Sequence, residues 1–326
     1  MRLRALLAFA TLSLSVFVSA CSHQGDSLVL AGDGTRMSSE EIDKDPLALL
    51  PGGALGLAYV DAQEAYKSQM GASFAAFTAA ALPLGPDANF DARRDVTKAF
   101  IGFYSLQGVD VAAVIQGNFD PDAIKSSVSK GSPTMLGAPL TKLSYAGNDL
   151  YIAGDVGFVV VTRHTVIAGN DVGIRRTLDR IRDKKVRRDV SEWMVQLIET
   201  PKASMVGVAD LSSQSALSAL AQQAPFLNNL QVARVLGNFQ APGINFAGAL
   251  TYPDAANAEV ASKSVQQLAQ LASWTSLLAI IGIRPPIQNM QVQVEKNDVQ
   301  FIVSIDAQGA SGILDSLSGA MRATKK

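Results

Sequence analysis

The chain has 326 residues, of which 48% are hydrophobic and 17% are charged. This composition excludes a globally disordered protein, and the length allows two domains of ordinary size. The formal net charge of −1 argues against a nucleic-acid-binding role for the whole surface. With one cysteine and two histidines, the chain cannot form an internal disulfide, and histidine metal sites are poorly supported.

The first 21 residues have the organisation of an export signal. Arg2 and Arg4 precede an uncharged apolar run over residues 5–20, which ends in small residues immediately before Cys21. The apolar run is too short for a comfortable membrane span, so a cleavable signal is predicted. This segment resembles the signal of bacterial lipoproteins, whose lipobox ends in a cysteine. The resemblance covers residues 1–21 only and implies that residues 1–20 are removed, that Cys21 receives diacylglycerol and that the new N-terminus is acylated, with palmitate as the expected acyl chain.

The same resemblance gives an expected location. A lipidated Cys21 would anchor the mature chain to a membrane outside the cytoplasm. Ser22 follows the cysteine where some lipoproteins of Gram-negative bacteria carry an aspartate that retains them at the inner membrane. We therefore expect the outer membrane, facing the periplasm, if the source is Gram-negative. Residues 21–48 are rich in Ser, Gly, Asp and Glu, and this composition predicts a flexible tether.

The remaining sequence indicates two divergent copies of one unit. We assign residues 49–185 to the first repeat, 186–199 to a connector helix and 200–326 to the second repeat. Each repeat opens with a proline and an apolar strand that ends at an aspartate, Asp61 or Asp210. An Asn-Asp turn follows later in each, at Asn148 and at Asn297. Both pairs are separated by 149 residues (210 − 61 and 297 − 148).

The predicted elements favour an α+β fold: two tandem divergent copies of an antiparallel sheet with helices packed on one face. Helices are expected at residues 62–82 and 211–236, after the opening strands, and at 170–184 and 310–322, where the repeats end. Strands are clearest near the C-terminus, where Val299, Phe301, Val303 and Ile305 alternate with more polar residues. Such alternation is typical of an antiparallel sheet with one wet face.

Residues 264–283 contain no charged residue and predict a long apolar helix. One interpretation is a helix buried between the sheet and the other repeat. The alternative is an apolar-ligand surface. Its wall would be formed by Leu271, Trp274, Leu278 and Ile281.

A basic run lies where the first repeat ends. Eight cations stand against Asp179 and Asp183, a local net charge of +6. The run could be a solvated helix face, or it could contact anionic lipid headgroups or an acidic partner. Downstream, Val186, Val190, Trp193 and Leu197 have helical spacing and should dock the connector helix onto a core. The eight cations are Arg175, Arg176, Arg180, Arg182, Lys184, Lys185, Arg187 and Arg188.

Catalytic motifs are missing from the sequence. It has no nucleophile elbow, phosphate loop, dinucleotide fingerprint or paired-histidine zinc motif, and His164 sits alone in a strand-like run. We predict no catalytic residue, metal or cofactor. The favoured function is a lipid-anchored, non-catalytic binding or scaffolding protein with an envelope protein as partner. The alternative is a carrier for an apolar ligand held between the repeats. A carboxylate-based hydrolase is a third, unfavoured class.

Overall fold

The computed structural model describes residues 37–105, 110–131, 134, 140–154, 156–200, 202–213, 217, 221–222, 224–274 and 287–323. Of residue 86 and of residues 268–274 and 320–323, only the backbone is described. The signal, Cys21 and His23 therefore lie outside the described residues.

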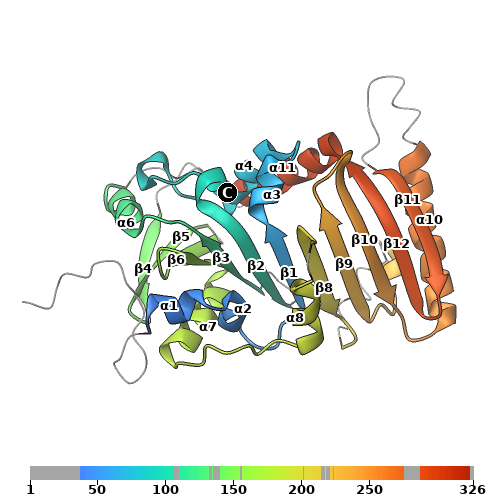
Figure 1. The fold of residues 1–326 in the computed structure, drawn as a ribbon, viewed down its shortest axis with the longest axis horizontal. Helices are drawn as coiled ribbons and strands as arrows, with labels where there is room; N and C mark the ends of the chain where they lie inside the picture. The colour runs from blue at the N-terminus through green and yellow to red at the C-terminus, as the bar shows by residue number, and fades with distance from the viewer. Residues whose placement is uncertain are drawn as a thin grey trace, which may run out of the picture.

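All described strands belong to one antiparallel sheet of twelve strands, which crosses the whole molecule (Figure 1). Its order is β11-β12-β10-β9-β8-β1-β2-β3-β7-β6-β5-β4. The α+β class is confirmed. The strands are β1 (Gly56–Asp61), β2 (Val96–Ser105), β3 (Asp110–Gly117), β4 (Thr141–Tyr145), β5 (Asn148–Ala153), β6 (Val156–Val160), β7 (Thr165–Gly169), β8 (Met205–Asp210), β9 (Val232–Asn238), β10 (Gly243–Thr251), β11 (Ile287–Glu295) and β12 (Asp298–Asp306).

The helices alternate with these strands in a pattern that differs between the two halves of the chain. Side-chain caps start several of them; Asp61, for example, accepts a hydrogen bond from the Glu64 amide. The helices are α1 (Ser39–Asp43), α2 (Pro46–Leu49), α3 (Ala62–Lys67), α4 (Gly71–Ala81), α5 (Ala92–Asp95), α6 (Pro121–Ser129), α7 (Asp171–Arg182), α8 (Glu192–Ile198), α10 (Ala255–Trp274) and α11 (Ala307–Ala323), with short 3₁₀ turns η1 (Pro86–Ala88) and η2 (Pro225–Leu227).

The two halves join edge to edge through their opening strands. β1 pairs antiparallel with β8, with Leu57 opposite Val208 and Ala58 opposite Gly207. From this junction the order is β1-β2-β3 on one side and β8-β9-β10 on the other, so three strands of each half occupy matching places. The predicted repeats thus form one continuous sheet.

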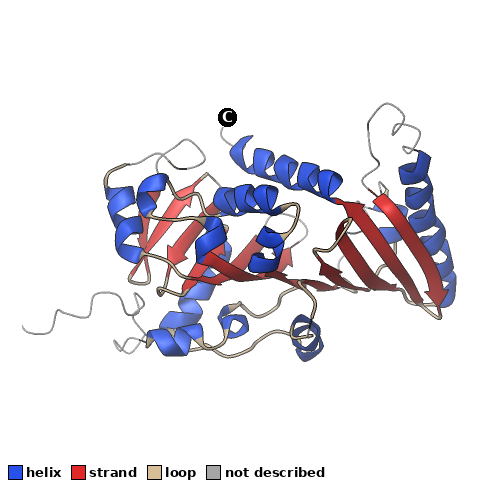
Figure 2. Cartoon of the chain, turned by 45° about the horizontal axis from the view of Figure 1, so that its top comes forward, coloured by secondary structure: helices blue, strands red, loops and turns tan. Residues whose placement is uncertain are grey.

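Helices cover the two halves differently, and this corrects the expectation of helices on one face throughout. In the first half, α1, α2, α7 and α8 lie on one face, named here the α7 face, and α3, α4 and α6 lie on the other. Figure 2 shows helices on both sides of these strands. In the second half, α10 and α11 pack on the same face as α3 and α4, named here the α10 face. The reason is visible in β6, where Phe158 and Val160 enter one core and Val159 enters the other, so both of its faces need cover.

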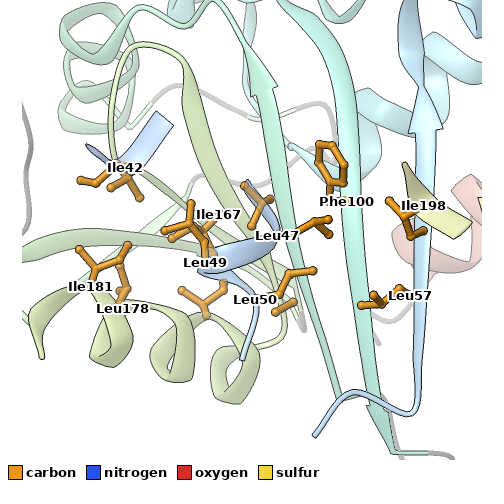
Figure 3. Packing of buried hydrophobic residues seen from close by; sticks show 14 of the residues in the cluster. Ile42, Leu47, Leu49, Leu50, Leu57, Phe100, Ile167, Leu178, Ile181 and Ile198 are labelled. Carbon is orange, nitrogen blue, oxygen red and sulfur yellow. The ribbon is translucent and has the colours of Figure 1, made fainter. Parts of the chain in front are cut away.

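The predicted tether extends too far into the folded body. Residues 38–50 form α1 and α2, and Ile42, Leu47, Leu49 and Leu50 are buried at 0–2% exposure. These side chains lie between α7 and the strands (Figure 3). Serine and acidic residues were misread as tether because they cap short helices: Ser38 and Glu41 form a capping box, and Asp45 caps α2.

Two further expectations are wrong in detail. The helix expected at residues 211–236 cannot extend that far, because β9 begins at Val232 and pairs with both β8 and β10. The hairpin turns at Asn148 and Asn297 are not equivalent. β12 lies directly beside β10, whereas β7 and β6 separate β5 from β3.

Other expectations are confirmed. The stripe of Val186, Val190, Trp193 and Leu197 packs against the core of the α7 face, as predicted. The connector helix is shorter than the expected residues 186–199, because α8 covers only Glu192–Ile198 and Val186 and Val190 precede it. α7 and α11 lie close to the helices expected near the ends of the repeats. Within the described residues, no helix has both the length and the apolar character needed to cross a membrane.

Candidate functional site

The α10 face of the sheet is apolar across both halves. Strand register places Ile101, Ala58, Gly207 and Val235 side by side on β2, β1, β8 and β9. The same row continues through Gly248 and reaches Phe301 and Val292, near the far edge. The two adjacent rows across β1 and β8 are also apolar, with Val60 opposite Met205 on one side and Gly56 opposite Ala209 on the other.

Side chains at the centre of this face are less buried than those on the opposite face of the same strands. On β8, Val206 and Val208 are buried against the α7-face core, while Gly207 between them is only partly buried. Ala58, Ile101 and Val235 are also partly buried, and Phe103 on β2 is 44% exposed. We call Ala58, Ile101, Phe103, Gly207 and Val235 the junction strip. An apolar surface that stays partly open in the middle of a sheet is the usual property of a binding surface.

Gly207 leaves space at the middle of the junction strip. A Cβ built on it would meet no atom of the described residues within 4 Å. Elsewhere on the same face, aromatic rings fill the space above glycine. A Cβ at Gly237 would lie 2.9 Å from the Phe246 ring, and one at Gly248 would lie 2.6 Å from the Phe301 ring. An aromatic ring therefore fills the place of the missing side chain at Gly237 and at Gly248, whereas no described atom does so at Gly207.

Packed clusters from both halves stand on either side of the strip. On one side, Met70 and Phe74 from α3–α4 meet Phe246 and Ala310 of the second half. The rings of Phe74 and Phe239 make an edge contact with centroids 5.1 Å apart. This cluster fixes α11 across the junction.

On the other side, Tyr252 packs with Leu230, Leu250 and α10. Its hydroxyl donates a 2.6 Å hydrogen bond to the carbonyl of Phe226, and burial raises its pKa. Close packing at both borders leaves the space over Gly207 empty of described atoms.

The junction strip contains no titratable side chain, so it supplies no acid, base or nucleophile. Among the described residues there is also no group of three or more His, Cys, Asp or Glu side chains able to hold a metal ion. His164 lies in the turn between β6 and β7, where its Nδ1 is 3.1 Å from the Gly117 carbonyl. What the strip offers chemically is apolar contact alone.

The basic run has more acidic partners than its local sequence suggests. The sequence expectation counted only Asp179 and Asp183, but the fold supplies Asp171, Asp110, Asp189, Asp45 and Glu199 as well. Eight cations against these seven acids leave a net charge of +1 instead of +6. The local excess of charge is therefore largely neutralised within the protein.

Several of these pairs join distant parts of the first half. Arg176 is 2.5 Å from Asp110 and lies over the Tyr104 ring, and Arg188 contacts both Asp45 and Glu199. The Arg180 side chain is only 12% exposed and donates to the carbonyl of Arg187 at 2.6 Å. In this position the run holds α7, α2 and the connector together. These arginines are thus paired within the protein, although the Arg176 and Arg188 side chains stay 37% and 41% exposed.

The predicted apolar wall cannot be placed in full. Leu271 and Trp274 belong to the last turns of α10, of which only the backbone is described, and Leu278 and Ile281 lie outside the described residues. The junction strip was not identified from the sequence. Its signal was present in the two opening strands, where small residues recur at alternate positions: Gly56 and Ala58 in one, Gly207 and Ala209 in the other.

Comparisons with known proteins show the fold alone. No family model matches the chain, and no curated protein matches it. Among solved structures, crystal form I of TP0453 is similar with a TM-score of 0.51 at 12% identity, covering 84% of this chain and 97% of that one. Crystal form III of TP0453 gives a TM-score of 0.50 at 9% identity, covering 83% and 98%. The large antiparallel sheet with helices is therefore an architecture with an experimental counterpart.

Proposed function

We propose that this chain is a lipid-anchored cell-envelope protein with a non-catalytic binding role, and that the junction strip binds an apolar ligand. The observation that carries this proposal is the space over Gly207, which no described atom fills within 4 Å and which lies at the centre of an apolar face. A ligand seated there would meet no hydrogen-bonding side chain in the strip. The part of the ligand that contacts the junction strip should therefore be a hydrocarbon such as an acyl chain.

The proposed anchor is Cys21. Ser38 caps the first described helix, and sixteen residues (22–37) separate Cys21 from it. Even fully extended, they would span at most roughly 55 Å. A lipidated Cys21 would thus keep the junction strip near a membrane surface, where acyl chains are abundant.

A protein-binding scaffold is the second candidate. The α7 face of the second half carries amide and hydroxyl side chains, including Asn245, which accepts a hydrogen bond from Ser304 and donates one to Asn238. Ile302 stands among them at 54% exposure. This face could contact a polar partner, but a solvated sheet face has the same composition.

Fluorescent fatty-acid binding tests the apolar-ligand proposal. The chain from Ser22 onward, which contains every described residue, is titrated with cis-parinaric acid. Gly207→Phe should weaken binding at least tenfold, because the new ring occupies the space over β8. Its thermal midpoint should stay equal or rise, since phenylalanine is better suited than glycine to a strand.

Gly312→Phe is the matched control, because a Cβ at Gly312 on α11 also meets no described atom within 4 Å. This variant should bind like the parent. Equal binding by the parent and by Gly207→Phe would exclude the junction strip as the site. An absence of any fatty-acid binding would favour the scaffold candidate.

Anchoring is tested separately with Cys21→Ser in the native host. The variant should accumulate as unprocessed precursor or lose its lipid, since no other cysteine can take the modification. Normal maturation with unchanged partitioning into detergent would contradict lipidation at this residue.

A further inference from the structure

The two edges of the sheet are built differently. One edge, β4, has five residues and carries Lys142, which pairs with Asp149 at 2.7 Å. The other edge, β11, has nine residues, and its only charge is Glu295 at the end. Proteins usually block exposed edges with short strands or lysines, because unpaired backbone groups attract other strands. β4 has this protection, and most of β11 does not.

The register shows which backbone groups of β11 face outward. Tyr252 N–H bonds to Asn297 O and Ala307 N–H to Pro242 O, so the odd-numbered residues of β12 bond to β10. The even-numbered residues of β12 must then bond to β11, where Gln291 lies opposite Ile302 and Gln293 opposite Gln300. The intervening residues Met290, Val292 and Val294 therefore direct their N–H and C=O groups away from β12, to the edge that no described strand covers.

The side chains of β11 indicate a partner strand in which apolar and polar residues alternate. Met290, Val292 and Val294 point to the α10 face, where they are partly buried beside Phe301 and α10. Asn289, Gln291, Gln293 and Glu295 point to the opposite face and are exposed. A strand added beside β11 would extend the apolar layer on one face and the amide layer on the other. It would need apolar residues alternating with polar ones.

We propose that β11 is a docking edge for an extended polypeptide segment of a partner protein, which adds as a thirteenth strand. Only an extended backbone presents donors and acceptors at the spacing of this edge. This inference is independent of the apolar-ligand proposal, because β11 and the junction strip are separated by β12 and β10.

A second copy of this chain does not fit the edge. α10 lies over β11, with Ala258, Ala261 and Val265 in the cluster that includes Met290 and Val292. A twofold pair of β11 strands would place the two strands about 5 Å apart, whereas helices with side chains are about 10 Å wide. The two α10 helices would overlap. A single strand from another protein brings no such helix.

A displayed peptide library tests the proposal. A phage library of 12-residue peptides is selected on the mature chain, and enriched peptides are synthesised for anisotropy titration. They should show apolar and polar residues in alternation. Val292→Pro should weaken their binding at least tenfold, because it removes an N–H that faces the edge and spares those that bond to β12. Val292→Ala keeps this N–H and should bind within threefold of the parent.

Thermal midpoints show whether each variant is folded, and Val294→Pro replaces Val292→Pro if the latter unfolds. Equal binding by folded proline variants and the parent would overturn the proposal, as would a selection that enriches no alternating peptide. Sedimentation of the parent as a dimer that Val292→Pro converts to a monomer would show that the occupant is a second copy, which also overturns it.

Discussion

The first half of the sheet carries helices on both of its faces, whereas most of the second half carries them on one. The difference is already visible in strand composition. β6 and the residue after it place Phe158, Val159, Val160 and Val161 in sequence, and all four are buried. β12 instead alternates, with Val299 buried and Ile302 exposed. One sheet can thus change from a three-layer to a two-layer arrangement when its strands change from continuous to alternating hydrophobicity.

The largest expected effect on stability comes from placing the same charge on the α7 face in each half. Val159→Asp in the first half should prevent stable folding, because an unpaired carboxylate in the core costs several kcal/mol. Ile302→Asp in the second half should change the free energy of unfolding by less than about 0.5 kcal/mol. Urea unfolding monitored by circular dichroism measures both. Similar losses would mean that the second-half face is covered after all.

A second test concerns the N-terminal segment that covers the α7 face. Leu49→Ala should cost about 2–5 kcal/mol, because Leu49 is fully buried and its removal leaves a cavity. Leu317→Ala on α11, where the leucine is half-exposed, serves as the control and should cost less than about 1 kcal/mol. Denaturant unfolding of both variants compares them. If both variants lost the same stability, α2 would belong to the flexible tether and not to the core.

The ion-pair network of the first half gives a smaller effect. Arg180→Gln should cost about 1–3 kcal/mol, since Asp189 loses its charged partner and the carbonyls of Ala48 and Arg187 lose donors. Arg187→Gln should be nearly neutral, because this exposed side chain has no ion pair among those described. Thermal unfolding separates the two, and a neutral Arg180→Gln would restore the solvated-face interpretation.

The smallest expected effect is on acid stability. Asp120 caps α6 in the first half and Asp254 caps α10 in the second, and hydrogen bonds from the Ala123 and Asn257 amides lower their respective pKa values. A lowered folded-state pKa stabilises the protein above the unfolded value of about 3.9, and this stabilisation is lost as the pH falls through the folded value. The double variant Asp120→Asn/Asp254→Asn should therefore lose less stability between pH 6 and pH 3.

The control for this experiment is Glu259→Gln on the outer surface of α10, which should keep the parent's pH profile. Urea midpoints at several pH values provide the measurement. A double variant with the same acid slope as the parent would show that the caps contribute no pH dependence.

Local signals in the sequence predicted much of the fold. The helix that follows Asp61, the alternating strand β12 and the docking stripe of Trp193 and Leu197 follow from residue type and spacing within a few positions. What sequence reasoning missed depends on long-range contact. Arg188, for example, pairs with Asp45 and Glu199, which lie 143 and 11 residues away in the sequence.

The candidate site was missed for a related reason. An apolar-ligand surface was the alternative interpretation of the helix near Leu271, because residues 264–283 contain no charged residue. The junction strip depends instead on small residues whose meaning appears only when β1 pairs with β8. Nothing in the local sequence distinguishes Gly207, whose space stays open, from Gly237, which Phe246 covers.

The pairing of β1 with β8 also sets the order in which the protein can assemble. Leu57 meets Gly102 on one side, 45 residues later in the chain, and Val208 on the other, 151 residues later (102 − 57 and 208 − 57). During synthesis β1 can therefore pair with β2 long before β8 exists, and its second edge then remains open beside an apolar face. Contacts this distant in sequence slow folding, and open apolar edges promote association between incomplete chains. The strand pair that unites the finished sheet therefore covers this edge of β1 only after β8 (Met205–Asp210) has been synthesised.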